Sequence, residues 1–176
     1  CSSDIDLIKA MLENNFKTIY TYETLSKKIG ISKVLLKKYL LNSENMFRFK
    51  NDDKWIITKK QYAFYNQKII SYLNTVHGNF VYREGVIKEE IIEELKLNSN
   101  FLENMLVSLN EEKKIKCKNN LYSEYNFKIH LSEEEVLLKK NILRVLNETD
   151  FNPPAIDELS DILNKDKIHI SKLLKI

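Results

Sequence analysis

The sequence predicts a mainly α-helical fold with small β-hairpins, on three observations. Its 176 residues include only three glycines and two prolines, too few for the many tight turns of a sandwich or barrel. Apolar residues recur at helical spacing along most of the chain. The order helix, helix, helix, hairpin occurs twice, and the three helices occur a third time. We therefore predict three small units at residues 4–59, 60–130 and 131–176.

The first unit shows the pattern from end to end. Apolar positions between residues 5 and 12 predict an amphipathic helix. Thr21 and Ser32 are suited to cap a second and a third helix, and Gly30 stands where a left-handed residue ends the second. Residues 46–50 and 55–58 alternate as strands do, with a polar turn between them.

The second unit repeats this order. Thr58 is placed to cap a long helix that ends at His77-Gly78, and residues 80–82 are expected to form a short extended link. Asn98 or Ser99 is placed to cap the third helix. The hairpin is expected at residues 115–118 and 121–122, around an Asn-Asn turn.

The third unit begins at Ser132, where a glutamate three residues later predicts a capping box. Pro153 and Pro154 break the chain before a second helix, and Asp166 is suited to cap a third. The caps of the third helices, taken at 32, 99 and 166, recur at intervals of 67 residues. This order is typical of winged helices, so we predict tandem winged-helix modules of the helix-turn-helix type, the third lacking its wing.

The net charge of +3 is concentrated at the start of the chain, since residues 1–60 hold 12 basic and 7 acidic side chains. A third helix of this type often lies in a groove of duplex nucleic acid. The candidate contacts to a nucleic-acid backbone are therefore Lys33, Lys37, Lys38, Arg48, Lys50 and Lys54. The competing interpretation is a solvated polar face, which every amphipathic helix has. Phe47, Phe49 and Trp55 could stack on bases, but at this spacing we expect them to hold the wing against the core.

No pattern for catalysis or cofactor binding is present. The three glycines do not form a phosphate-binding loop, and the three histidines are far apart in sequence, without metal-ligand spacing. Two distant cysteines predict neither a disulfide framework nor a zinc site. We expect a non-enzymatic chain with no catalytic residue, no cofactor and no metal. Without an export signal or a long apolar segment, we expect it to be cytoplasmic and away from membranes.

Several short motifs resemble the bacterial selenocysteine-specific translation elongation factor. Residues 76–90 resemble its "YH … PLRxG … KEEL" stretch, with Phe80-Val81-Tyr82 departing from the Pro-Leu of the family. Residues 131–135 resemble "LSxEE", and residues 151–154 followed by Glu158-Leu159 resemble "F-x-PP … EL". The matching positions, expected to be structural, are His77, Arg83, Gly85, Lys88, Glu89, Glu90, Pro153 and Pro154. The resemblance covers roughly residues 60–176.

This resemblance implies a role in protein biosynthesis. The family joins a GTP-binding, tRNA-binding part to a string of four winged helices, and its last winged helix binds the selenocysteine-insertion hairpin of the mRNA. Its partners are the ribosome, that hairpin and selenocysteinyl-tRNA. The chain would be a C-terminal spacer arm without the GTPase or the hairpin-binding module, with weak or no specific nucleic-acid binding of its own. Two other hypotheses stay open: a DNA-binding replication initiator or transcriptional regulator, and a protein-interaction scaffold.

Overall fold

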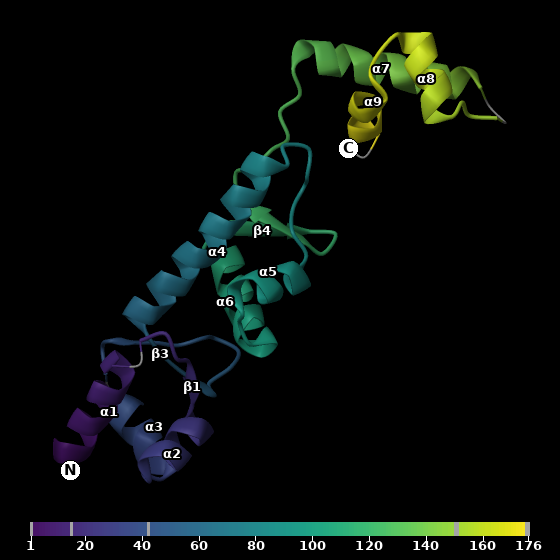
Figure 1. The fold of residues 1–176 in the computed structure, drawn as a ribbon. Helices are drawn as coiled ribbons and strands as arrows, with labels where there is room; N and C mark the ends of the chain where they lie inside the picture. The colour runs from purple at the N-terminus through teal and green to yellow at the C-terminus, as the bar shows by residue number, and fades with distance from the viewer. Residues whose placement is uncertain (1, 15, 42, 150–151, 175–176) are drawn as a thin grey trace.

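The computed structural model describes residues 2–14, 16–41, 43–149 and 152–174. It is mainly helical, with one three-stranded and one two-stranded antiparallel sheet, which confirms the predicted mainly helical fold with small hairpins. The elements form an elongated row, with the N-terminal helix at one end and the last three helices at the other (Figure 1). Within these residues, no helix combines the length and apolar character needed to cross a membrane.

The first group of elements holds three helices and a small sheet. It comprises α1 (Ser2–Asn14), β1 (Tyr20–Thr21), α2 (Tyr22–Ile29), α3 (Lys33–Leu41), β2 (Met46–Phe47) and β3 (Trp55–Thr58). Thr21 caps α2, and Gly30 ends it with a φ of +71°, as the sequence predicted. The strands pair in the order β1-β3-β2, with Tyr20 opposite Ile56. The helices and strands of this group enclose a buried hydrophobic cluster of Ile8, Leu12, Tyr20, Leu25, Leu36, Leu40 and Ile56.

The middle group is built on the long helix α4 (Lys59–Asn79), which follows β3 without a loop. Thr58 and Gln61 form its capping box, and its 21 residues span about 31 Å. The group continues with α5 (Lys88–Leu95), α6 (Ser99–Glu111), β4 (Ile115–Lys118) and β5 (Leu121–Glu124). Asn119 and Asn120 both have positive φ, as a tight two-residue hairpin turn requires.

The first and middle groups share a hydrophobic core. Phe49 and Ile57, from the first hairpin, belong to the same buried cluster as the inner faces of α4, α5 and α6. Phe101 of α6 belongs to this cluster and is 1% exposed, with its ring centroid 5.4 Å from that of Trp55 and 6.0 Å from that of Phe49. The two groups are therefore held together by burial as well as by chain connection.

Polar contacts reinforce this shared core. The Gln61 side chain is fully buried and donates to the backbone carbonyls of Phe16 at 2.9 Å and Thr18 at 3.2 Å. The Tyr65 hydroxyl donates to the Lys17 carbonyl at 2.7 Å. These three carbonyls lie between α1 and β1, so the start of α4 satisfies backbone acceptors that would otherwise lack partners. The predicted boundary between residues 59 and 60 thus coincides with extensive contact, and the domain division itself stays a prediction.

The last group comprises α7 (Glu133–Glu148), α8 (Ile156–Leu163) and α9 (Lys167–Leu173). Ser132 and Glu135 form the predicted capping box, and Asp166 caps α9. The group has a separate small core of Leu138, Ile142, Val145, Leu159, Ile170 and Leu173. Tyr82 of the middle group packs against this core, and its hydroxyl donates a hydrogen bond to the Glu135 carboxylate. Figure 1 shows that an extended segment joins the two groups.

Two local predictions are corrected, and one choice that the sequence left open is decided. The strand expected at residues 46–50 is only Met46–Phe47, because Phe49 turns into the shared core instead of pairing with β3. Residues 80–82 form a turn, not an extended link, since Arg83 N donates to the Phe80 carbonyl at 2.9 Å. Of the two caps predicted for α6, the structure has Asn98, whose side chain accepts from two backbone amides. The caps of the third helices therefore lie at 32, 98 and 166.

Candidate nucleic-acid interface

The candidate cations of the first group lie on α3 and on the loop that joins β2 to β3. Lys37 on α3 is 2.5 Å from Asp53 of that loop, and its hydrogen bond lowers the pKa of Asp53. Lys54 forms an ion pair with Asp52 at 3.1 Å and lies over the Trp55 ring. Both lysines are thus already paired with carboxylates of the β2–β3 loop.

The remaining candidates divide into paired and unpaired side chains. Lys50 forms an ion pair with Glu111 of α6 at 2.6 Å. Arg48 donates to the carbonyls of Leu40 and Leu41, at the end of α3, where a cation also complements the helix dipole. Lys33 and Lys38 are exposed and make no hydrogen bond or ion pair with any described residue.

These internal ion pairs reduce the net positive charge of the predicted interface but do not cancel it. Six cations face three carboxylates, those of Asp52, Asp53 and Glu111, so the net charge of the surface is +3. Exposed ion pairs contribute about 0–1 kcal/mol, so a phosphate can replace a carboxylate at little cost. The whole set nevertheless attracts a polyanion less than its six cations suggest.

The aromatic residues of the first hairpin do not form a stacking surface for bases. Phe47 stacks on Tyr62 of α4, with ring centroids 3.6 Å apart. Phe49 is buried, and Trp55 packs edge-on against Phe101 while its ring nitrogen donates to Asp52 at 3.1 Å. All three rings contact neighbouring elements, as expected for residues that fix a hairpin against the core.

The motif positions around the start of α5 contact one another and the second hairpin. Arg83 forms an ion pair with Glu90 at 2.5 Å and donates through Nε to the Gly85 carbonyl at 2.9 Å. A Cβ on Gly85 would lie 2.7 Å from the Tyr122 carbonyl oxygen, so only glycine permits the Val86–Tyr122 bridge to β5. The motif therefore ties the entrance of α5 to the second hairpin.

Two further motif residues also contact neighbouring elements. Lys88 lies 3.4 Å from Glu103 of α6. His77 is 6% exposed and stacks on Phe127, with ring centroids 3.6 Å apart. Burial lowers the pKa of His77, so its neutral form is favoured in the fold.

The other motif positions take no part in a described polar site. Glu89 lies in the first turn of α5, where a carboxylate complements the helix dipole. Pro153 and Pro154 lie in the segment that leads into α8, and Phe151 of the same motif lies outside the described residues. In the part of the chain that the structure describes, no group of three or more His, Cys, Asp or Glu side chains could hold a metal ion.

The basic side chains of the second hairpin were not among the contacts that the sequence predicted. Lys116, Lys118 and Lys128 line one hollow beside β4 and β5, which Lys113 and Lys114 do not line. The alternation of Lys116 and Lys118 with the apolar Ile115 was the available signal, because alternate residues of a strand face the same side. The position of Lys128 depends on how residues 125–129 fold back, which no local pattern indicates.

Sequence comparisons add no relative to these observations: no protein-family model and no curated protein matches the chain.

Proposed function

We propose that the chain is a non-catalytic arm of a selenocysteine-specific translation elongation factor, built of tandem winged helices. In this role it connects the GTPase and tRNA-binding part to the module that binds the mRNA hairpin, in the cytoplasm and without a cofactor of its own. The hypothesis rests on the motif resemblance, and one structural observation carries it further. The first hairpin is buried in the same core as α4 and α6.

A spacer must keep its two ends at a fixed separation. Interdomain contacts that are small and polar permit relative motion by default, whereas a large apolar contact opposes it. Here the rings of Phe49, Trp55 and Phe101 pack together, and Asn104 of α6 donates to Asp52 at 3.0 Å. These contacts favour a rigid connection between the first and middle groups.

The role as a spacer also predicts weak selectivity for RNA. The test is fluorescence anisotropy with a labelled selenocysteine-insertion hairpin and a scrambled hairpin of equal length. The two RNAs are expected to bind with affinities within about threefold of each other, because no base-reading surface is proposed in this fragment. A preference of about a hundredfold or more for the insertion hairpin would contradict the proposal.

A DNA-binding regulator is the second candidate, and the exposed Lys33 and Lys38 on α3 favour it. This function predicts a salt-sensitive affinity for duplex DNA that is abolished in a Lys33→Ala, Lys37→Ala, Lys38→Ala variant. Absence of duplex binding at about 50 mM salt would count against it.

A further inference from the structure

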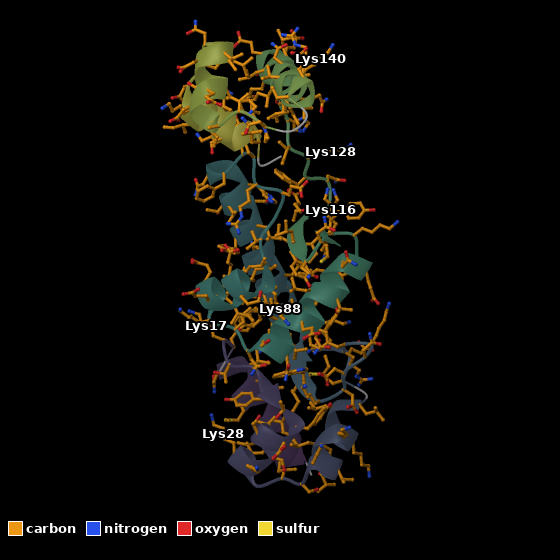
Figure 2. All side chains as sticks on the ribbon, turned by 90° about the vertical axis from the view of Figure 1, so that its right-hand side faces the viewer. Lys17, Lys28, Lys88, Lys116, Lys128 and Lys140 are labelled. Atoms are coloured by element: carbon orange, nitrogen blue, oxygen red, sulfur yellow. The ribbon has the colours of Figure 1, made fainter. Side chains whose placement is uncertain are left out.

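A small hollow of about 280 Å³ lies against the outer face of the β4–β5 hairpin. Lys116 and Lys118 contribute from β4, and Ser123 from β5. Lys128 contributes from the segment that follows the hairpin. Figure 2 shows Lys116 and Lys128 at neighbouring levels along the molecule, between Lys88 of α5 and Lys140 of α7. Three lysine side chains from two chain segments therefore line one concavity.

Strand register explains why these side chains share a face. Lys116 is directly opposite Ser123, and Lys118 is opposite Leu121. Because side chains of a strand alternate between its two faces, these four lie on one side of the hairpin. Ile115, on the other side, is fully buried against the core. The hairpin thus presents an apolar face inward and a lysine-rich face to the hollow.

The far wall of the hollow is fixed by contacts with α4. The Lys116 ammonium donates to the Phe127 carbonyl at 2.5 Å, and the Phe127 ring stacks on His77 of α4. Lys128 follows directly and has no hydrogen bond or ion pair with any described residue. The segment around Phe127 is therefore held in place beside the hollow by these two contacts.

Ser123 is the second observation that points to a ligand. It is 2% exposed, it lines the hollow, and its hydroxyl makes no hydrogen bond with any described residue. Because this hydroxyl can donate, an acceptor placed in the hollow would give it a hydrogen-bond partner. A hydroxyl beside several ammonium groups matches the hydrogen-bonding capacity of a phosphate oxygen.

The charge balance of the hollow also favours an anion. Its one lining carboxylate is that of Glu84, 3.9 Å from the Lys118 ammonium. Three cations against one carboxylate leave a net charge of +2. Glu124 of the same strand faces the opposite side, since it pairs with Ile115.

We propose that this hollow binds a backbone phosphate of structured RNA, with Lys116, Lys118 and Lys128 as charge partners and Ser123 as a hydrogen-bond donor. The choice of RNA rests on the proposed function in translation, whereas the preference for phosphate follows from the hollow itself. The contact is independent of base sequence, because Phe127, the one aromatic residue among the described residues that line the hollow, is already stacked on His77.

The test compares two variants with the same reduction in charge. One is Lys116→Gln, Lys118→Gln, Lys128→Gln, and the matched control is Lys59→Gln, Lys140→Gln, Lys172→Gln, at three exposed lysines outside the hollow and outside the candidate interface. Binding of a labelled RNA hairpin is measured by anisotropy from about 50 to 200 mM salt. The hollow variant is expected to bind about tenfold more weakly at low salt, and its salt slope should fall by about one for each phosphate that it no longer binds. The control is expected to change the affinity by less than about threefold.

Equal effects in the two triple variants would overturn the proposal, because net charge alone would then explain binding. An unchanged hollow variant would overturn it as well. The double variant Lys118→Gln, Lys128→Gln retains the Lys116–Phe127 bond and guards against misfolding, which circular dichroism also monitors. Ser123→Ala keeps every charge and is expected to weaken binding severalfold, and an unchanged affinity would exclude a phosphate beside Ser123.

Two further arms identify the source of the phosphate. Inorganic phosphate at matched ionic strength is expected to displace RNA only slightly more than chloride does, and displacement at low millimolar concentration would show a free-anion site instead. Duplex DNA carries the same phosphates and is compared at equal length, and tighter binding of DNA than of RNA would contradict the RNA assignment. These results concern absolute affinity, so they are separate from the hairpin-to-scrambled ratio that tests the spacer role.

Discussion

Phe101 is the residue whose replacement tests the shared core most sharply. Its side chain is 1% exposed, and it contacts Phe49, Trp55 and Tyr65 at ring-centroid distances of 6.0, 5.4 and 5.4 Å. A buried phenylalanine replaced by alanine costs about 3–5 kcal/mol, which includes the removal of its aromatic packing. At about 2–4 °C per kcal/mol for a chain of this size, the midpoint of thermal unfolding should fall by about 6–20 °C.

The assay uses two probes on the same sample. Trp55 is the only tryptophan, so its fluorescence reports the first hairpin, whereas far-UV circular dichroism reports all helices. In Phe101→Ala both midpoints should fall, although Phe101 lies outside the first group. Val107→Ala on the same helix is the control, since Val107 is 44% exposed and should cost less than about 1 kcal/mol. A Trp55 transition that stays unchanged in Phe101→Ala would refute the shared core.

Three further changes test other contacts. Gly85→Ala places a Cβ 2.7 Å from a backbone oxygen of β5 and should reduce the free energy of unfolding, measured in urea, by about 1–3 kcal/mol. Gly78→Ala is the control, because its Cβ meets no atom within 4 Å. Equal losses in the two variants would contradict the close contact between Gly85 and β5. Burial lowers the pKa of His77, so the unfolded chain takes up its proton first and stability should fall from about pH 7.5 to pH 5. His77→Phe should reduce that dependence, and an identical pH profile would exclude His77 as its source. Tyr82→Phe removes the hydrogen bond to Glu135 and should speed amide hydrogen exchange in α7 relative to α4. Unchanged exchange rates in α7 would show that this bond does not stabilise the last group.

Local chemistry made much of the fold predictable. Thr21, Thr58, Ser132 and Asp166 each cap the helix that the sequence assigned to them, because capping depends on neighbouring residues alone. The hairpin at Asn119-Asn120 was predictable for the same reason, since asparagine tolerates the positive φ that the turn requires.

Features that depend on distant residues were not predictable in this way. The pattern around Phe49 is typical of a strand, but its ring is drawn into the core by Phe101, which lies 52 residues later. Tertiary packing here outweighs local strand preference. The candidate interface shows the same limit: Lys50 is basic by sequence, yet it pairs with Glu111 of a different group.

The hollow beside the second hairpin depends partly on local sequence and partly on distant residues. Strand alternation predicts that Lys116 and Lys118 share a face. The contribution of Lys128 depends on the stack between His77 and Phe127, which joins residues 50 positions apart. The sequence therefore predicts the two strand lysines of the site but not the third.

The rigid connection between the first and middle groups is the claim on which the spacer role depends. Spin labels at Lys27→Cys on α2 and Asn74→Cys on α4, with Cys1 and Cys117 replaced by serine, allow the distance between the groups to be measured by double electron–electron resonance. Both labelled positions are exposed and lie on helices on either side of the shared core. The shared core predicts one narrow distance distribution in the parent chain that broadens in Phe101→Ala. A broad or bimodal distribution in the parent chain would contradict the rigid arm.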